Sequence, residues 1–194
     1  MIRLDHEIIA GIIEPGARVL DLGCGNGDLL AFLKEQKGVR GTGIEIDEEE
    51  VLRCLERGVA VTQGNINDGL GVYGDKRFDY VIFNESLQQV LKIDKVLGEA
   101  LRVGRHVIVG IPNFCHLGAR LQLFFRGRVP VTKSLPFHWY DTPNLRFLSL
   151  KDFRSFCAKK GISIERARYL TAGKEVVLAP NLLAEEAIFV IRKD

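Results

Sequence analysis

Cysteine is scarce in this chain of 194 residues, and the four cysteines stand apart without a C-x-x-C pair. The four histidines complete no metal-ligand spacing around them, so we expect reduced thiols and no metal site. The chain also lacks an apolar N-terminal segment and any run of about 18 apolar residues, which argues against secretion or a membrane span and makes the cytoplasm the expected location. A net charge of only +2 argues against a general nucleic-acid-binding protein.

The rest of the composition is typical of a single globular domain. Hydrophobic residues make up 46% of the chain, and neither repeats nor low-complexity segments occur. A domain of this length buries on the order of two-thirds of its unfolded surface. Residues 1–194 can therefore form one core without a disulfide or a metal to stabilise it.

Helical and strand patterns alternate along most of the chain. The apolar periodicity predicts helices over 3–13, 28–36, 48–57, 92–102 and 149–160, and strands over 18–22, 39–46, 59–62, 78–83, 106–111, 162–169 and 187–191. Strands separated by helices of this length form right-handed crossovers and parallel pairs. We therefore expect an α/β fold with a seven-stranded, mostly parallel sheet, helices on both faces, and an antiparallel strand in the last pair.

Residues 113–147 interrupt this alternation. They contain three prolines and many aromatic side chains, so the segment is too apolar for a disordered linker. We expect a partly helical insertion that lies over the carboxyl ends of the strands and covers the site. Within it, Trp139 and Tyr140 either anchor an interface or fill the core beneath.

The same insertion is basic. Its local charge is +4, because Asp141 stands alone against five cations, Arg120, Arg126, Arg128, Lys133 and Arg146. This imbalance indicates either a solvated basic face or a docking surface for an acidic partner or an anionic substrate.

The most informative motif is a glycine turn that follows the apolar segment 19–22. Gly23, Gly25 and Gly27 give the spacing G-x-G-x-G. Glycine allows backbone conformations closed to other residues and leaves no Cβ between the main chain and a ligand. The turn is therefore either a binding site for a nucleotide-sized ligand or a tight turn with no ligand. Cys24 within it is either a reactive nucleophile or a space-filling residue, and we favour the second because no base adjoins it in the sequence.

Two acids at this turn bear on which ligand it takes. The dinucleotide pattern G-x-G-x-x-G requires a glycine where this chain has Asp28. Asp21 and Asp28 together make the turn acidic, which disfavours the pyrophosphate of NAD or FAD. S-adenosylmethionine (SAM) carries a sulfonium and an ammonium and has no phosphate, so it fits the turn better than the alternative, a dinucleotide.

Further candidate contacts follow the second and third predicted strands. Glu45 stands 24 residues after Asp21, a distance at which a carboxylate accepts both ribose hydroxyls and rejects a 2′-phosphate. Ile46 is placed to pack on an adenine face, and Asn65 and Ile66 are weaker candidates for the adenine edge. The alternative for Glu45 is a surface acid at a strand end.

The fourth predicted strand ends in Asn84, Glu85 and Ser86, where an open parallel sheet presents residues to a ligand. A transferase would hold its acceptor here. Methyl transfer from a sulfonium is an in-line displacement that mainly requires positioning, with a general base only when the acceptor loses a proton. The sequence leaves the catalytic residues unknown, and the possible bases are Glu85, His116, His138, Tyr140 and Asp141.

The motifs over residues 20–27, 43–47 and 78–82 together resemble the class I SAM-dependent methyltransferases, which have a Rossmann-like fold. A closer resemblance, to the MetW methionine biosynthesis proteins, rests on residues 83–89, 101–105 and 111–114, and above all on L-P-F-H-W-Y-D-T-P-N at 135–144. This resemblance covers nearly the whole chain.

The resemblance implies a site and a partner. The implied contacts of SAM or S-adenosylhomocysteine are Asp21, Gly23, Cys24, Gly25, Gly27, Glu45, Ile46, Asn65, Ile66 and Asn84. The implied substrate or partner contacts are Glu85, Ser86, His138, Trp139, Tyr140 and Asp141. MetW proteins are linked with homoserine O-acyltransferases (MetX), which implies a SAM-binding protein of methionine biosynthesis that modulates the acyltransferase. The alternatives are an active methyltransferase on a small metabolite or on that partner, and an oxidoreductase, which the acidic turn disfavours.

Overall fold

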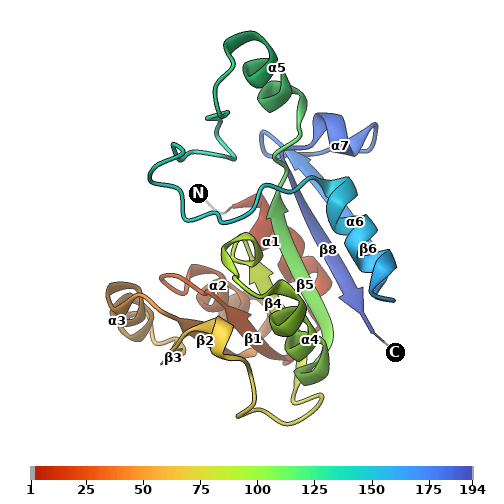
Figure 1. The fold of residues 1–194 in the computed structure, drawn as a ribbon. Helices are drawn as coiled ribbons and strands as arrows, with labels where there is room; N and C mark the ends of the chain where they lie inside the picture. Colours follow the sequence, from red (N-terminus) through yellow and green to blue (C-terminus); the bar gives the residue numbers. More distant parts are fainter. Residues whose placement is uncertain (1–2, 194) are drawn as a thin grey trace.

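The apolar strand segments assemble into one sheet with the strand order β3-β2-β1-β4-β5-β8-β6-β7 (Figure 1). The computed structural model describes residues 3–193. The first five strands in this order are parallel: β1 (Arg18–Leu22), β2 (Arg40–Glu45), β3 (Ala60–Gln63), β4 (Phe78–Asn84) and β5 (Gly104–Pro112). The others pair antiparallel: β6 (Ser163–Thr171), β7 (Lys174–Glu175) and β8 (Glu186–Arg192). The predicted α/β fold with a mostly parallel sheet is confirmed.

The strand count differs from the prediction, because the described residues form eight strands and not seven. The additional strand, β7, contains two residues and pairs with the end of β6 at the sheet edge. Ala172 and Gly173 form the turn between them, with φ of 45° and 74°. Positive φ at both central residues is the requirement of a type I′ turn, one of the two common turns that join hairpin strands through two residues. A strand this short has no apolar alternation from which a sequence pattern could reveal it.

Helices cover both faces of the sheet, because successive strand residues point to opposite faces. Val19 lies in a core cluster with α1 and α2, whereas Leu20 lies in a second cluster with α4 and α6. The helices on the first side are α1 (Leu4–Ile12), α2 (Asp28–Lys37) and α3 (Glu48–Glu56), and those on the second are α4 (Ile93–Val103) and α6 (Leu150–Lys159). Short helical segments complete the fold: η1 (Ile66–Asp68), η2 (Leu87–Gln89) and α7 (Pro180–Leu183).

The strand ends that form the site lie together at one edge of the sheet. The parallel strands all finish there, and antiparallel β8 begins there, since Glu186 pairs with Pro112. The segment after β5 leaves from this edge, and its helix α5 (Leu117–Arg126) projects beyond the sheet (Figure 1). Within residues 3–193, no helix has the length and apolar character needed to cross a membrane.

Candidate functional site

The glycine turn is held against two neighbouring strands. The amides of Gly23 and Cys24 both donate to the carbonyl of Ile44 on β2, at 2.8 and 3.2 Å. Gly23 has a φ of +74°, and a Cβ at this position would lie 2.8 Å from the Cβ of Ser86 after β4. Glycine is therefore required there by both backbone conformation and space. At Gly25, with a φ of +52°, a Cβ would meet nothing within 4 Å, so this residue borders open space.

Two cavities of about 330 Å³ each flank this turn, and both are lined by Gly23, Gly25 and Glu85. The first extends along the end of β2 and is lined by Glu45, Ile46, Asn65, Ile66 and Ser86. The second extends along the end of β1 and is lined by Asp21, Cys24, Asn84, Arg3 and His6. Most of the residues that the sequence indicates as cofactor contacts are thus brought together around one turn.

Gly27 is placed differently from the other two glycines. It has a φ of 77° at the start of α2, and a Cβ there would lie 2.9 Å from the Sγ of Cys54. Neither flanking cavity has Gly27 in its described lining. Its role in the structure is to allow close packing of α2 against α3.

Asp21 is the buried acid of the site. It is 2% exposed, and its Oδ1 has no hydrogen-bond partner among the described residues. Burial, and secondly the nearby Glu45 carboxylate, raise the pKa of Asp21 to about 7. A buried carboxylate without a partner is costly unless a donor or a cation reaches it. The wall of the second cavity therefore favours a cationic group.

Glu45 connects the end of β2 to the glycine turn. Its Oε2 accepts from the amide of Gly25 at 2.8 Å, and its Oε1 accepts from the amides of Ile46 and Asp47 at 2.7 and 3.0 Å. A carboxylate has about four acceptor positions, so capacity remains for hydroxyl donors in the cavity. Glu45 is 9% exposed, which does not fit the alternative of a surface acid.

The residues expected near an adenine all line the first cavity, but they differ in exposure and in hydrogen bonding. Ile46 is 62% exposed and presents an apolar surface to it. The Oδ1 of Asn65 already accepts from the amide and the side chain of Asn67, at 2.9 Å each, and so caps η1. Ile66, within η1, is half-buried.

The side chain of Cys24 points into the core. Its Sγ lies 3.9 Å from that of Cys54 and occupies the space beside Gly43 where a Cβ would stand. Burial, followed by the Asp21 carboxylate, raises the pKa of the Cys24 thiol far above its ordinary value. A thiol that resists ionisation is a poor nucleophile, so the structure favours the space-filling interpretation.

Glu85 stands where the cavities meet. Its φ of 59° is unusual for a residue other than glycine. Its amide donates to the carbonyl of Gly110 at 2.9 Å, and its carbonyl accepts from the side chains of Gln88 and Gln89 at 2.7 and 3.3 Å. The carboxylate pairs with Arg3 at 3.0 Å. Strained residues held in place by several contacts are concentrated at functional sites.

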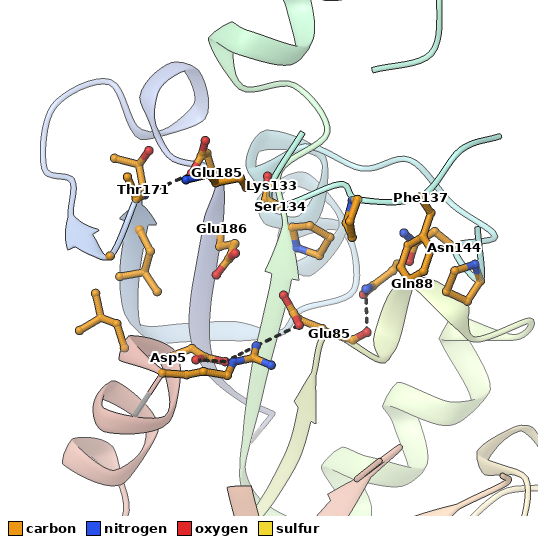
Figure 2. Close-up of a pocket in the computed structure, with 18 of the residues that line it drawn as sticks. Asp5, Glu85, Gln88, Lys133, Ser134, Phe137, Asn144, Thr171, Glu185 and Glu186 are labelled. Atoms are coloured by element: carbon orange, nitrogen blue, oxygen red, sulfur yellow. Dashed lines mark hydrogen bonds and ion pairs between the residues drawn. The ribbon is translucent and has the colours of Figure 1, made fainter. Parts of the chain in front are cut away.

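A third, larger cavity of about 560 Å³ lies on the other side of Glu85 (Figure 2). It separates the sheet edge from residues 133–144 of the insertion and is lined by Arg3, Asp5, Gln88, Lys133, Phe137 and Glu186, among others. Sequence reasoning missed Arg3, Asp5 and Glu186. Glu186 could have been found, because the start of an antiparallel strand beside β5 must lie at the carboxyl edge. No local pattern placed the beginning of α1 there.

The remaining predicted residues separate into two groups. Ser86 is 6% exposed, and its Oγ donates to the carbonyl of Leu22 at 2.5 Å, so it supports the glycine turn from behind. His138, Trp139, Tyr140 and Asp141 are exposed and lie outside the described lining of all three cavities. Since Trp139 is 74% and Tyr140 69% exposed, the alternative that they fill the core is wrong.

A family model described as methionine biosynthesis protein MetW matches residues 3–191. The bifunctional methionine biosynthesis protein MetXA/MetW of Rhodopirellula baltica is 34% identical over 206 residues, which cover 100% of this chain and 33% of that protein. The chain belongs to the MetW family. It spans about a third of the length of this bifunctional relative.

Solved structures show the same fold as this MetW family member. A SAM-dependent methyltransferase from Archaeoglobus fulgidus superimposes with a TM-score of 0.70 at 14% identity, over 97% of this chain and 94% of that one. The [4+2]-cyclase SpnF gives a TM-score of 0.70 at 18% identity, over 97% of this chain and 80% of that one. The fold is therefore that of the SAM-dependent methyltransferases, and it is shared by a protein named for a different reaction.

Asp21→Asn is expected to remove a pH dependence of stability. The pKa of Asp21 is raised from 3.8 to about 7 in the folded protein, so between these values the folded state binds more protons than the unfolded state. Stability should then fall as the pH rises through this window, by up to about 1.4 kcal/mol per pH unit, and level off above it. Urea denaturation from about pH 5 to about pH 8 should show this slope in the native sequence relative to Asp21→Asn. Parallel curves for the two proteins would contradict the assignment.

Proposed function

We propose that this MetW family member binds SAM or S-adenosylhomocysteine across the glycine turn. The observation that carries the proposal is the buried, unpartnered carboxylate of Asp21 beside the open face of Gly25. Asp21 would take the ammonium of the ligand, and Glu45 would accept from the ribose hydroxyls. Ile46 would pack on the adenine. When bound, SAM supplies an electrophilic methyl group on a sulfonium.

The charges of the turn support this ligand over a dinucleotide, with one refinement. Asp28 forms an ion pair with Arg57, so its charge is largely compensated and repels a pyrophosphate less than the sequence indicates. Asp21 and Glu45 have no cation paired with them among the described residues. They supply the negative potential that disfavours phosphate and favours a cationic ligand.

We further propose that the protein acts with a homoserine O-acyltransferase and modulates it in methionine biosynthesis. The bifunctional relative carries both names, MetXA and MetW, on one chain, which supports a functional association of the two activities. The insertion at 113–147 would then have two roles, covering the site with residues 133–144 and presenting a docking surface on α5. An active methyltransferase is the second candidate function, supported by the larger cavity that adjoins the glycine turn through Glu85.

Helix α5 has the properties of a docking surface. Phe124 and Phe125 are 82% and 76% exposed, and their rings meet edge to face with centroids 5.0 Å apart. Arg126 and Arg128 follow them and form no hydrogen bond or ion pair within residues 3–193. Exposed aromatic residues flanked by arginine are enriched at the centres of protein interfaces. An acidic surface with an apolar centre would complement this helix.

The ligand proposal predicts the outcome of calorimetry on the purified chain. S-adenosylhomocysteine should bind with a measurable affinity, and NAD should bind at least about tenfold more weakly, because its pyrophosphate would face Asp21 and Glu45. Titrations of SAM, S-adenosylhomocysteine and NAD under one buffer condition make the comparison. Tighter binding of NAD would overturn the proposal.

Replacement of Glu45 should affect both binding and stability. Glu45→Ala is expected to weaken S-adenosylhomocysteine binding by roughly tenfold to a hundredfold, since one or two charge-assisted hydrogen bonds to the ribose are lost. It should also lower the free energy of unfolding by about 1–3 kcal/mol, because amides of Gly25, Ile46 and Asp47 lose their acceptor. Glu45→Gln is the matched control, since its amide oxygen can still accept from two of these amides. Unchanged affinity in Glu45→Ala would show that the ribose is held elsewhere.

The docking proposal predicts the effect of reversing charge at the C-terminal end of α5 and just beyond it. Arg126→Glu combined with Arg128→Glu should abolish copurification with the homoserine O-acyltransferase at physiological salt, while S-adenosylhomocysteine affinity and melting temperature stay unchanged. Lys37→Glu combined with Arg40→Glu is the matched control, because it makes the same charge change at the opposite edge of the sheet. Persistence of the complex in the α5 variant would rule out this surface.

A further inference from the structure

The larger cavity contains a carboxylate, that of Glu186, which pairs with no cation among the described residues. The side chains of Asp5, Glu85, Glu185 and Glu186 line it, against the cations Arg3 and Lys133. Arg3 is already engaged, since it pairs with Asp5 at 2.8 Å and with Glu85 at 3.0 Å. Glu185 accepts from the amide of Ala172 at 3.2 Å.

The side chain of Glu186 forms no hydrogen bond and no ion pair within residues 3–193. Figure 2 shows its carboxylate in the open centre of the cavity, between Glu185 on one side and Glu85 on the other, with no dashed line to any neighbour. Glu186 is the first residue of β8, and its backbone pairs on both sides, with Pro112 of β5 and Leu170 of β6. The carboxylate is therefore presented from a rigid part of the sheet and not from a loop.

The surroundings of Glu186 oppose its ionisation. Burial is the largest cause, followed by the carboxylates of Glu85 and Asp5; Arg3 acts in the opposite direction, and Glu185 adds to the repulsion. Together they raise the pKa of Glu186 to about 7. A cation placed beside Glu186 would relieve this repulsion, whereas an anion would add to it.

A second polar group of the cavity also lacks a partner. Gln88 is 3% exposed and lines the cavity, and its Oε1 has no hydrogen-bond partner among the described residues. This amide oxygen would be satisfied by a hydrogen-bond donor and not by another acceptor. The apolar part of the lining comes from Phe137, Pro136, Pro143 and Leu170.

We propose that this cavity is a binding site for a small primary amine, whose ammonium lies on the Glu186 carboxylate and whose apolar body lies against Phe137. An ammonium supplies both the positive charge and the N–H donors that the polar groups of the cavity lack. The site adjoins the cavities around the glycine turn: Glu85 lines all three, Arg3 is shared with one of them and Gln89 with the other. The proposal does not depend on SAM binding or on docking to the acyltransferase.

Three probes of matched shape test this proposal by calorimetry, with the perturbed residues mapped by NMR. 2-Phenylethylamine is the cationic probe, 2-phenylethanol is the neutral probe, and 3-phenylpropionate is the anionic probe. The amine should bind at least about tenfold more tightly than the alcohol or the acid, which is the effect of one charge-assisted hydrogen bond. Perturbed resonances should include Glu186, Gln88 and Phe137.

Substitutions at two neighbouring residues distinguish specific binding at Glu186 from a general attraction of cations to an acidic cavity. Glu186→Gln should weaken amine binding by about tenfold or more. Glu185→Gln should leave it within about twofold, because Glu185 is already used by the amide of Ala172. Thermal melts verify that both variants are folded, and Glu186→Gln should not lower the melting temperature, since it removes a buried charge repulsion.

Three results would overturn the proposal: equal affinities for the amine and the alcohol, native-like amine binding by Glu186→Gln, or no amine binding in the millimolar range. A titration of S-adenosylhomocysteine on the same sample keeps the two proposals apart. Binding of this ligand without binding of the amine rejects the amine site alone. The converse result rejects the SAM proposal alone.

Discussion

The site depends on one constraint: several acidic side chains at the carboxyl edge of the sheet have no cation paired with them among the described residues. Asp21, Glu45 and Glu186 reach this edge from three strands, and none of them forms an ion pair within the described chain. Placing acids in a partly buried position is unfavourable unless something offsets their charge. The fold tolerates this cost at the one edge where ligands of α/β sheets bind. A cationic ligand would offset it, which connects the proposed sulfonium ligand with the proposed amine.

The main features of the fold could be predicted because they rest on local periodicity. Alternating strand and helix segments predict parallel strand pairs, and the helix expected over 149–160 begins at a capping box formed by Ser149 and Asp152. The turn of β7 depends on the positive φ of Ala172, which no pattern of hydrophobicity reports. The exposure of Trp139 likewise depends on how far the insertion stands from the sheet, a matter of tertiary packing.

The candidate site was predictable to the extent that it follows the parallel register. Asp21 pairs with Gly43, two residues before Glu45, so the two acids meet because β1 and β2 are adjacent and parallel. Arg3 and Asp5 reach the site only through the packing of α1, and Glu186 only through the reversed direction of β8. The contacts that the sequence analysis missed therefore come from elements outside the repeating strand-helix units. Of these, Glu186 follows from an antiparallel strand beside β5, whereas Arg3 and Asp5 follow from no local pattern. Their roles stay predictions, as do those of the glycine turn, because a fold shared by methyltransferases and a cyclase does not assign a reaction.

The strained backbone of Glu85 decides how the two proposed ligands can influence each other. Its conformation is held by Gly110 on one side and by the side chains of Gln88 and Gln89 on the other, and its carboxylate is held by Arg3. A wall fixed from so many directions cannot act as a gate between the cavities without losing these contacts together. Coupling between the sites must then be mainly electrostatic, since cations on either side share the field of one carboxylate that is already paired. Such ligands would weaken each other modestly, and a neutral occupant of either cavity would leave the other unaffected.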